Sequence, residues 1–243
     1  TRASYYEGAG ALRDMVQNHI LQLLCLIAME PPYSLDPDVV RNARMDVLRG
    51  LRPIRGKDVE QMTVRAQYAH GIIKDQEVPG YRREEGVQPD STTETYVALK
   101  VFMENWRWAG VPFYIRTGKA MATRATEIAV QFKDIPQILF NANPQTPQAP
   151  NLLTLRIQPE EGMALRIISK VPGTKAQTHP VEMDFHYGDA FESPSPEAYE
   201  RLLLDVMAGD TSLFMRRDAV EASWKWVTDI LEGWSAYETK WLP

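Results

Sequence analysis

The chain has 243 residues, of which 44% are hydrophobic and 24% charged, so it can bury a sizeable core as one large domain or two small ones. Its formal net charge of -5 provides no basic field for a nucleic-acid backbone or an anionic membrane, and we expect neither partner. The single cysteine, Cys25, excludes an internal disulfide and favours a reducing compartment, which predicts a cytoplasmic protein.

The apolar runs and the first residue of the chain support two further expectations. No apolar run approaches the ~20 residues that a membrane-spanning helix requires. The chain begins with Thr1 instead of methionine, and we therefore expect it to be a piece of a longer protein.

The first predicted helix covers residues 12–30, "LRDMVQNHILQLLCLIAME", and ends before Pro31 and Pro32. Its apolar stripe, at α-helical spacing, also contains His19 and consists of Leu12, Met15, Val16, Ile20, Leu23, Leu24 and Ile27. A second helix is predicted from Pro37 to Leu51, with Asp36 as its N-cap.

Strands are predicted in the middle of the chain, where apolar and polar residues alternate. The segments are 64–68, 93–101, 111–116, 128–132, 153–157 and 181–187. Two more helices follow: Ser195 and Pro196 mark the start of one, and Asp218 with Glu221 resembles a capping box at the start of the other. The apolar face predicted for the last helix is Val220, Trp224, Val227, Leu231 and Trp234.

This order of elements predicts an α+β fold with a large, mainly antiparallel sheet and helices packed on one face. The resumed alternation after a proline-rich connector at residues 141–151 favours one domain over residues 1–243. The other face of the sheet is covered either by solvent or by a second copy of the chain, which would give a dimer.

His19 is the first candidate for chemistry, because imidazole, with a reference pKa of about 6.5, accepts a proton at neutral pH. The alternative is a core histidine that is bonded to a carbonyl group. At ~100° per residue Asp14 lies ~140° from His19 around an α-helix, so the two would reach one ligand from different sides. Asp14 alone is also explained as a first-turn acid that the helix dipole favours.

A second candidate is the turn "YIRTGKAMATR", residues 114–124, where Gly118 lets the backbone approach a ligand and Lys119 and Arg124 supply two cations. A solvated basic hairpin is the alternative. The third candidate is Gln158, at the polar end of the strand in "TLRIQPEEG", although most such glutamines are merely exposed.

Several other chemistries lack a signature in the sequence. Neither G-x-G-x-x-G nor G-x-x-x-x-G-K occurs, and the four histidines are too scattered to indicate a zinc site. No G-x-S-x-G nucleophile turn is present, and the only cysteine lies in an apolar helix.

Five segments together resemble the carboxyl-terminal domain of the glucose-6-phosphate dehydrogenase family, and bacterial members most. They are "LRDMVQNHILQLLCLIAMEPP", "DSTTETYVALK", "ENWRWAGVPFYIRTGKAM", "LRIQPEEG" and "EAYERLLLDVMAGD". The resemblance runs from Arg2 to Trp234, and its most specific parts are R-D-x-x-Q-N-H and G-V-P-F-x-x-R-x-G-K.

The resemblance implies a role for each candidate residue. His19 matches the general base that takes the proton of the C1 hydroxyl while hydride passes to the NADP nicotinamide and a lactone forms. Asp14, Lys119, Arg124 and Gln158 match positions that bind glucose 6-phosphate. The resemblance implies no role for Tyr5.

The resemblance also implies what this chain lacks. The family's preceding Rossmann domain carries the main NADP site and the carboxylate that orients the base, so we expect this chain alone to be inactive. Homodimers or tetramers through the sheet are expected. Some members hold a structural NADP on this domain, but we expect none here, because alanines stand at three of its contact positions although Arg116 and Arg156 remain: Ala125, Ala129 and Ala164.

An alternative to the enzyme is a non-catalytic paralogue or assembly module that keeps the fold and regulates a partner. The joint presence of Asp14, His19, Lys119, Arg124 and Gln158 favours the enzyme, because a pure scaffold would not require that set.

Overall fold

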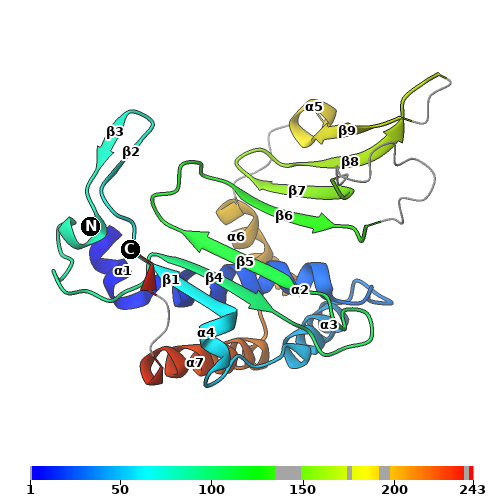
Figure 1. The fold of residues 1–243 in the computed structure, drawn as a ribbon. Coiled ribbons are helices and arrows are strands. Elements are labelled where there is room, and N and C mark those ends of the chain that lie inside the picture. Colours follow the sequence, from blue (N-terminus) through cyan, green and yellow to red (C-terminus); the bar gives the residue numbers. More distant parts are fainter. Residues whose placement is uncertain (1, 135–148, 174–176, 192–197, 238–240, 243) are drawn as a thin grey trace. The chain divides into compact units, whose positions relative to one another are not determined.

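The structure is a computed structural model that describes residues 2–134, 149–173, 177–191, 198–237 and 241–242. By its internal contacts the chain forms two compact units (Figure 1): Thr1–Ala122 with Arg201–Pro243, and Thr123–Glu200. The prediction of one domain over the whole chain stays a prediction. No helix within the described ranges is both long and apolar enough to cross a membrane.

The first unit combines one sheet with most of the helices. Its sheet has the order β10-β1-β4-β5, in which β1 pairs antiparallel with β4 and parallel with β10. These strands are β1 (Thr63–Ala66), β4 (Tyr96–Val101), β5 (Phe113–Gly118) and β10 (Trp241–Leu242), and a separate hairpin consists of β2 (Gly71–Ile73) and β3 (Gln76–Val78). The helices are α1 (Arg2–Ala11), η1 (Leu12–Ile20), α2 (Leu21–Ala28), α3 (Pro37–Gly50), α4 (Asp58–Met62), η2 (Tyr81–Arg83) and α7 (Arg217–Ala236).

The second unit is a four-stranded antiparallel sheet whose strands follow chain order. Its elements are β6 (Thr126–Gln131), β7 (Leu152–Gln158), β8 (Gly162–Lys170), β9 (Thr178–His186) and the short helix α5 (Tyr187–Phe191). Helix α6 (Ala198–Ala208) follows. Its predicted start at Ser195 and residues 141–148 of the predicted connector lie outside the described residues. The predicted α+β class with antiparallel sheets is confirmed, but the described strands form two four-stranded sheets and a two-stranded hairpin instead of one large sheet.

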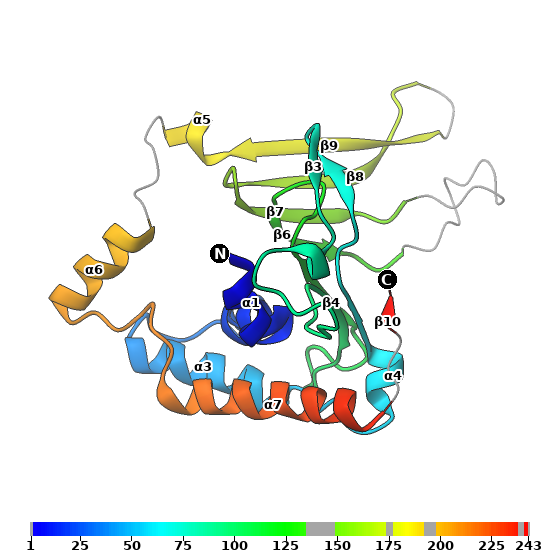
Figure 2. The ribbon, with the colours of Figure 1, turned by 90° about the vertical axis from the view of Figure 1, so that its left-hand side faces the viewer.

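The hydrophobic core of the first unit lies between its sheet and its helices. Helices α2, α3 and α7 lie on one side of the sheet, and α3 runs beside α7 (Figure 2). Alternate residues of β4, Val97, Leu99 and Val101, are almost fully buried in this core. The buried Trp234 indole donates a hydrogen bond to Thr63 Oγ1 at 2.8 Å, so this polar group of the core is satisfied.

The first predicted helix is continuous but not uniformly α-helical, because η1 is a π-helix in which Leu21 N–H donates to Val16 O, five residues earlier. Leu12 and Val16 are buried as predicted. Beyond them Leu24 is also buried as predicted, but the rest of the stripe is shifted by one position, because the wider turn takes up one extra residue. The helix buries Leu21, Cys25 and Ala28 where Ile20, Leu23 and Ile27 were expected, and it also buries the polar Gln17.

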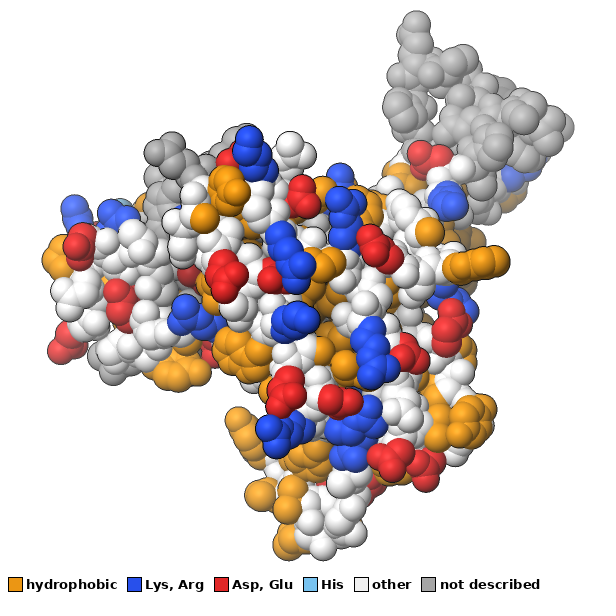
Figure 3. Space-filling view, turned by 90° about the horizontal axis from the view of Figure 1, so that it is seen from below, with side chains coloured by type: hydrophobic (Ala, Val, Ile, Leu, Met, Phe, Trp, Pro, Cys, Tyr) orange, Lys and Arg blue, Asp and Glu red, His pale blue; other side chains and the backbone are white. Residues whose placement is uncertain are grey.

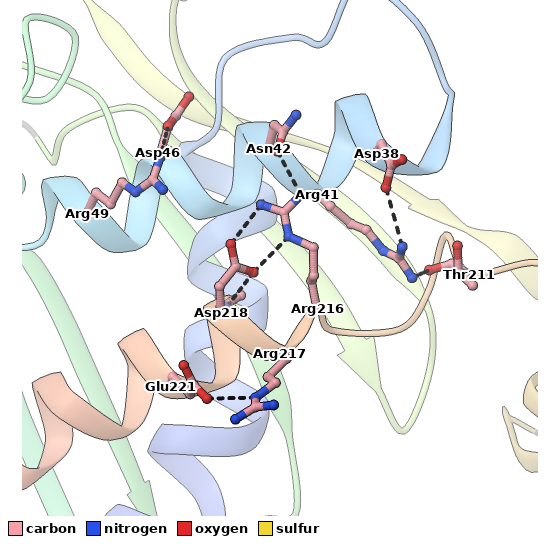
Figure 4. A network of polar contacts seen from close by, with 11 residues as sticks. Asp38, Arg41, Asn42, Asp46, Arg49, Thr211, Arg216, Arg217, Asp218 and Glu221 are labelled. Atoms are coloured by element: carbon pink, nitrogen blue, oxygen red, sulfur yellow. Dashed lines mark hydrogen bonds and ion pairs between the residues drawn. The ribbon is translucent and has the colours of Figure 1, made fainter.

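The predicted caps differ in outcome. Asp36 caps α3 as expected, since its carboxylate accepts a hydrogen bond from Asp38 N–H at 2.9 Å. The capping box predicted for the last helix is wrong (Figure 4): α7 begins earlier, with Arg216 as its N-cap. Asp218 lies inside the first turn and binds Arg216 at 2.7 Å.

The other member of the predicted capping box, Glu221, is engaged elsewhere. It forms an ion pair with Arg217, four residues earlier on the helix surface, at 2.8 Å (Figure 4). The charged side chains of this helix start therefore pair with one another, and Asp218 also accepts a hydrogen bond from Ala219 N–H at 2.9 Å.

The buried face of α7 is also rotated from its prediction. Val227 and Trp234 are buried as expected, but Trp224 is 41% exposed. The face that packs on the core is Ala219, Ser223, Trp226, Val227, Ile230 and Trp234. Acidic and basic side chains are mixed on the surface in Figure 3, and ion pairs on these helices include Arg49 with Asp46.

Candidate functional site

Helix η1 carries both Asp14 and His19, and its geometry changes how they relate. His19 is exposed, so its predicted place in the buried stripe is wrong. The residue that the helix buries in its stead is Gln17, whose amide donates to Ser223 Oγ on α7 at 3.1 Å.

The predicted ~140° separation of Asp14 and His19 is wrong for the same reason. In the i→i+5 pattern of a π-helix one turn takes more than four residues, so residues five apart come close to the same face. His19 therefore follows Asp14 by about one turn. A carboxylate and an imidazole can then reach one ligand from one side.

The Asp14 carboxylate is the centre of a polar cluster. Its Oδ2 lies 3.5 Å from Lys119 Nζ, and its Oδ1 accepts a hydrogen bond from Tyr5 OH at 3.3 Å. The Asp14 side chain is 20% exposed and that of Lys119 is 44% exposed, so both keep access to solvent. The structure thus brings together two candidates that are separated by 105 positions in the sequence.

The Lys119 ammonium packs against the face of the Tyr6 ring. The ammonium lies 4.6 Å from the centroid of the Tyr6 ring, which is a cation–π distance. The ring itself is buried, with 4% exposure, so it holds this position firmly. Burial, helped by the negative charges of Asp14 and Glu94, raises the pKa of the Tyr6 hydroxyl and keeps it protonated.

Tyr5 and Tyr6 were missed from the sequence. They precede the family's histidine motif, and an aromatic pair on a partly exposed helix carries no chemical signature of its own. Tyr5 contacts Asp14, and Tyr6 contacts Lys119, which directly follows β5 far along the chain. Only the aromatic character of positions 5 and 6 pointed to them.

The backbone holds the Lys119 turn in place at the end of β5. The Lys119 N–H donates to Thr95 O at 2.9 Å, next to the start of β4. A Cβ at Gly118 would lie 2.8 Å from the Tyr96 ring, so only glycine lets the turn come this close to β4.

Arg124 and Gln158 belong to the second unit. Gln158 is the last residue of β7 and pairs with Thr126, two residues after Arg124. Both side chains are exposed. The structure therefore brings these two candidates to the same end of the second sheet.

Of the positions considered for a structural NADP, Ala129, Arg156 and Ala164 lie on this second sheet, whereas Arg116 lies on β5 of the first. Ala129 and Ala164 both pair with Thr154, one from each side. Arg156 forms an ion pair with Asp184 at 2.8 Å, and hydrogen bonding to Arg156 lowers the pKa of that carboxyl. Arg156 is thus engaged by an acidic side chain.

The described residues have a definite chemical inventory at this site. They contain no group of three or more histidine, cysteine or acidic residues that could hold a metal ion. The first unit offers a carboxylate beside an ammonium, and an imidazole about one helical turn from the carboxylate, which are groups that can bind hydroxyl groups and accept a proton. The protein is thus of the α+β class, with a cluster of polar side chains at η1 and the turn that follows β5.

Comparisons with known proteins then place the chain in a family. The family profile described as "Glucose-6-phosphate dehydrogenase, C-terminal domain" matches residues 1–242. The chain belongs to this family, as its carboxyl-terminal domain.

Two curated relatives are glucose-6-phosphate 1-dehydrogenases. That of Mycolicibacterium smegmatis is 49% identical over 233 residues, covering 96% of this chain and 47% of that protein. That of Bacillus subtilis is 48% identical over 238 residues, covering 98% of this chain and 48% of that protein. The chain thus spans about half the length of the curated relatives it matches.

Solved structures show the same fold. A glucose-6-phosphate dehydrogenase in complex with its substrate glucose-6-phosphate superposes with a TM-score of 0.85 at 34% identity, over 100% of this chain and 49% of that one. The enzyme from Mycobacterium avium superposes with a TM-score of 0.81 at 36% identity, over 100% of this chain and 48% of that one.

Proposed function

We propose that this chain supplies the general base and part of the sugar site of an NADP-dependent glucose-6-phosphate dehydrogenase. The observation that carries the proposal is the contact of Lys119 with Asp14 on the π-helix that also carries His19. The cluster is accessible, and it combines an acceptor, a donor and a base. A solved relative is described in complex with glucose-6-phosphate, which is the substrate that we assign.

In the proposed reaction each side chain has a distinct task. His19 takes the proton of the C1 hydroxyl as the C1 hydride leaves, so the carbon is oxidised to a lactone carbonyl. Asp14 accepts hydrogen bonds from sugar hydroxyls. Lys119 donates a hydrogen bond to the sugar, while its contacts with Tyr6 and Asp14 keep its ammonium group in place. Arg124 and Gln158 are proposed to contact the same substrate.

NADP, when bound, accepts the hydride as the oxidant of the reaction. The chain contains no glycine-rich dinucleotide fingerprint, and we propose that the main coenzyme site lies on the half of the enzyme that the relatives carry in addition. We propose no structural NADP on this domain, which the alanines on both sides of Thr154 and the Arg156–Asp184 pair support.

The assembly and the compartment are proposed from the family and the surface. Strand β9 is an edge of the second sheet and exposes Val181 and Met183, at 41% and 54%. These features support a homodimer or tetramer formed through the sheet. A cytoplasmic location fits the lone, buried Cys25.

The decisive test is the His19→Asn variant of the full-length enzyme, assayed for formation of reduced NADP from glucose 6-phosphate. We expect kcat to fall by ~10²-fold or more with little change in KM, because a general base acts in the transition state. His70→Asn is the matched control, since the exposed His70 pairs with Glu77 of strand β3 and lies outside η1. An unchanged kcat would return His19 to a structural role, and a wild-type enzyme that does not oxidise the sugar would favour the assembly module.

A further inference from the structure

The π-helix η1 begins directly after a sharp kink, and one distant side chain holds its first residues. Gly10, at the kink, has φ +74° and ψ 167°. Immediately after it, Ala11 N–H donates to Glu94 O at 2.9 Å and Leu12 N–H donates to Glu94 Oε1 at 3.0 Å. Backbone and side chain of one residue thus satisfy two amide groups that an uncapped helix start would leave free.

The kink and Glu94 fit each other closely. A Cβ at position 10 would lie 2.5 Å from Glu94 Oε1, and φ +74° is a conformation that residues with a Cβ rarely adopt. Glycine at position 10 therefore leaves the space that the Glu94 carboxyl occupies. Gly10 and Glu94 together set the direction of η1 relative to α1.

The burial of Glu94 argues that this position matters to more than stability. Glu94 is 7% exposed, and burying a carboxyl group carries a desolvation cost that its contacts offset only in part. Arg13 and Arg65 lie close enough to favour the charged form, but burial dominates. A smaller polar residue would cap a helix at lower cost, whereas the reach of Glu94 is what spans the distance to Leu12.

Thr95, the residue after Glu94, contacts the turn that carries Lys119. Thr95, fully buried, accepts the Lys119 N–H with its carbonyl at 2.9 Å. The dipeptide 94–95 therefore contacts both the helix that carries Asp14 and the turn that carries Lys119. Asp14 and Lys119, whose charged groups lie 3.5 Å apart, are thus both linked to this dipeptide through the backbone.

We propose that Glu94 is a positioning residue of the dehydrogenase, which orients the π-helix so that Asp14 and His19 face the sugar beside Lys119. The inference rests on the proposed function for its catalytic consequence. Glu94 itself does not touch the substrate in this account. It acts through the Leu12 amide and the Gly10 kink.

Three substitutions in the full-length enzyme separate geometry from charge. Glu94→Gln keeps the length and an acceptor oxygen, Glu94→Asp keeps the charge but is one methylene shorter, and Glu94→Ala removes both. We expect Glu94→Asp and Glu94→Ala each to lower kcat and to raise KM for glucose 6-phosphate. In each variant kcat/KM should fall roughly 10- to 100-fold, because small misplacements of reacting groups have such effects. KM for NADP is expected to change little, and Glu94→Gln to stay within about threefold of the wild type.

A control variant separates positioning from a general loss of stability. Val59→Ala removes buried methyl groups from α4, a different helix of the same core, and should lower the free energy of unfolding by about 1–3 kcal/mol. Assayed well below its melting temperature, it should keep the wild-type KM for the sugar. If Glu94→Ala does not fold, the comparison of Glu94→Gln with Glu94→Asp still decides.

A second readout uses the chain described here and needs no activity. Amide hydrogen exchange of Leu12 should be slow in the wild type and in Glu94→Gln, and at least about tenfold faster in Glu94→Asp, relative to core amides of β4. Wild-type kinetics in Glu94→Asp, or loss of activity in Glu94→Gln alone, would overturn the proposal. A wild-type enzyme without glucose-6-phosphate oxidation would instead reject the proposed function, and unchanged Leu12 exchange in Glu94→Asp would reject the Glu94 contact separately.

Discussion

Lys119 Nζ lies 3.5 Å from Asp14 Oδ2 and 4.6 Å from the Tyr6 ring centroid, so one ammonium group joins a π-helix to the helix before it. The two charged groups are partly exposed, and solvent therefore weakens their attraction. Their value to the protein lies in placing a donor and an acceptor side by side rather than in stability.

This pairing predicts a coupled effect on sugar binding. In the full-length enzyme, Asp14→Asn and Lys119→Met should each raise KM for glucose 6-phosphate about tenfold, as a lost charged hydrogen bond does. The double variant should lose less than the product of the two, by a coupling energy of about 0.5–1 kcal/mol. Lys57→Met, at the exposed N-cap of α4, is the control. Strictly multiplicative effects would show that the two groups act independently.

The hydroxyl of Tyr6 predicts an unusual gain of stability. It is buried without a hydrogen-bond partner among the described residues, whereas the equally buried Tyr81 donates to Glu7 Oε2 at 2.6 Å. An unsatisfied buried donor costs about 1–3 kcal/mol, so Tyr6→Phe should raise the free energy of unfolding by up to that amount. Tyr81→Phe, the matched change, should lower it. Urea denaturation of both variants measures the contrast, and destabilisation by Tyr6→Phe would reveal a partner for its hydroxyl.

The buried bond between Gln17 and Ser223 predicts an asymmetric double-mutant cycle. Ser223→Ala leaves the Gln17 amide without its partner in the core and should cost about 1–2 kcal/mol of unfolding free energy. Adding Gln17→Leu makes both sides apolar and should recover most of that loss. Equilibrium unfolding of the two single variants and the double variant gives the coupling. Additive losses would mean that the bond does not hold η1 against α7.

The buried carboxyl of Glu94 predicts a pH dependence of stability. Burial raises its pKa in the folded protein, more than the Leu12 N–H and the nearby arginines lower it. Between the unfolded value of about 4.3 and the raised pKa, the folded state holds the proton that the unfolded chain has lost. The free energy of unfolding contributed by this group therefore falls as pH rises through that window.

Comparison of the wild type with Glu94→Gln isolates this contribution, because the amide does not titrate. The difference in unfolding free energy between the two proteins should shift in favour of Glu94→Gln as pH rises above about 4.3. A difference that is constant with pH would show that the carboxyl is not desolvated in the folded protein.

Sequence patterns predicted the elements that depend on local chemistry. Asp36 before Pro37 marked the start of α3, and the alternating apolar residues of 96–101 marked β4, because capping and strand pleating act over neighbouring residues. Strand β8 was not predicted, since its residues 163–168, apolar apart from Arg166, do not alternate with polar residues. The family resemblance likewise depended on contiguous motifs, and the match over residues 1–242 confirms it.

The sequence by itself determined the α+β class, the family and the candidates Asp14, His19 and Lys119. The tertiary structure alone decided where those side chains point. A π-helical turn forms when contacts outside the helix compensate its hydrogen-bond pattern, and here those contacts come from residues such as Glu94 and Ser223, more than 80 positions away. Periodicity assumes 3.6 residues per turn, so it placed His19 in the core. The packed structure, with one extra residue in the turn, places it at the surface.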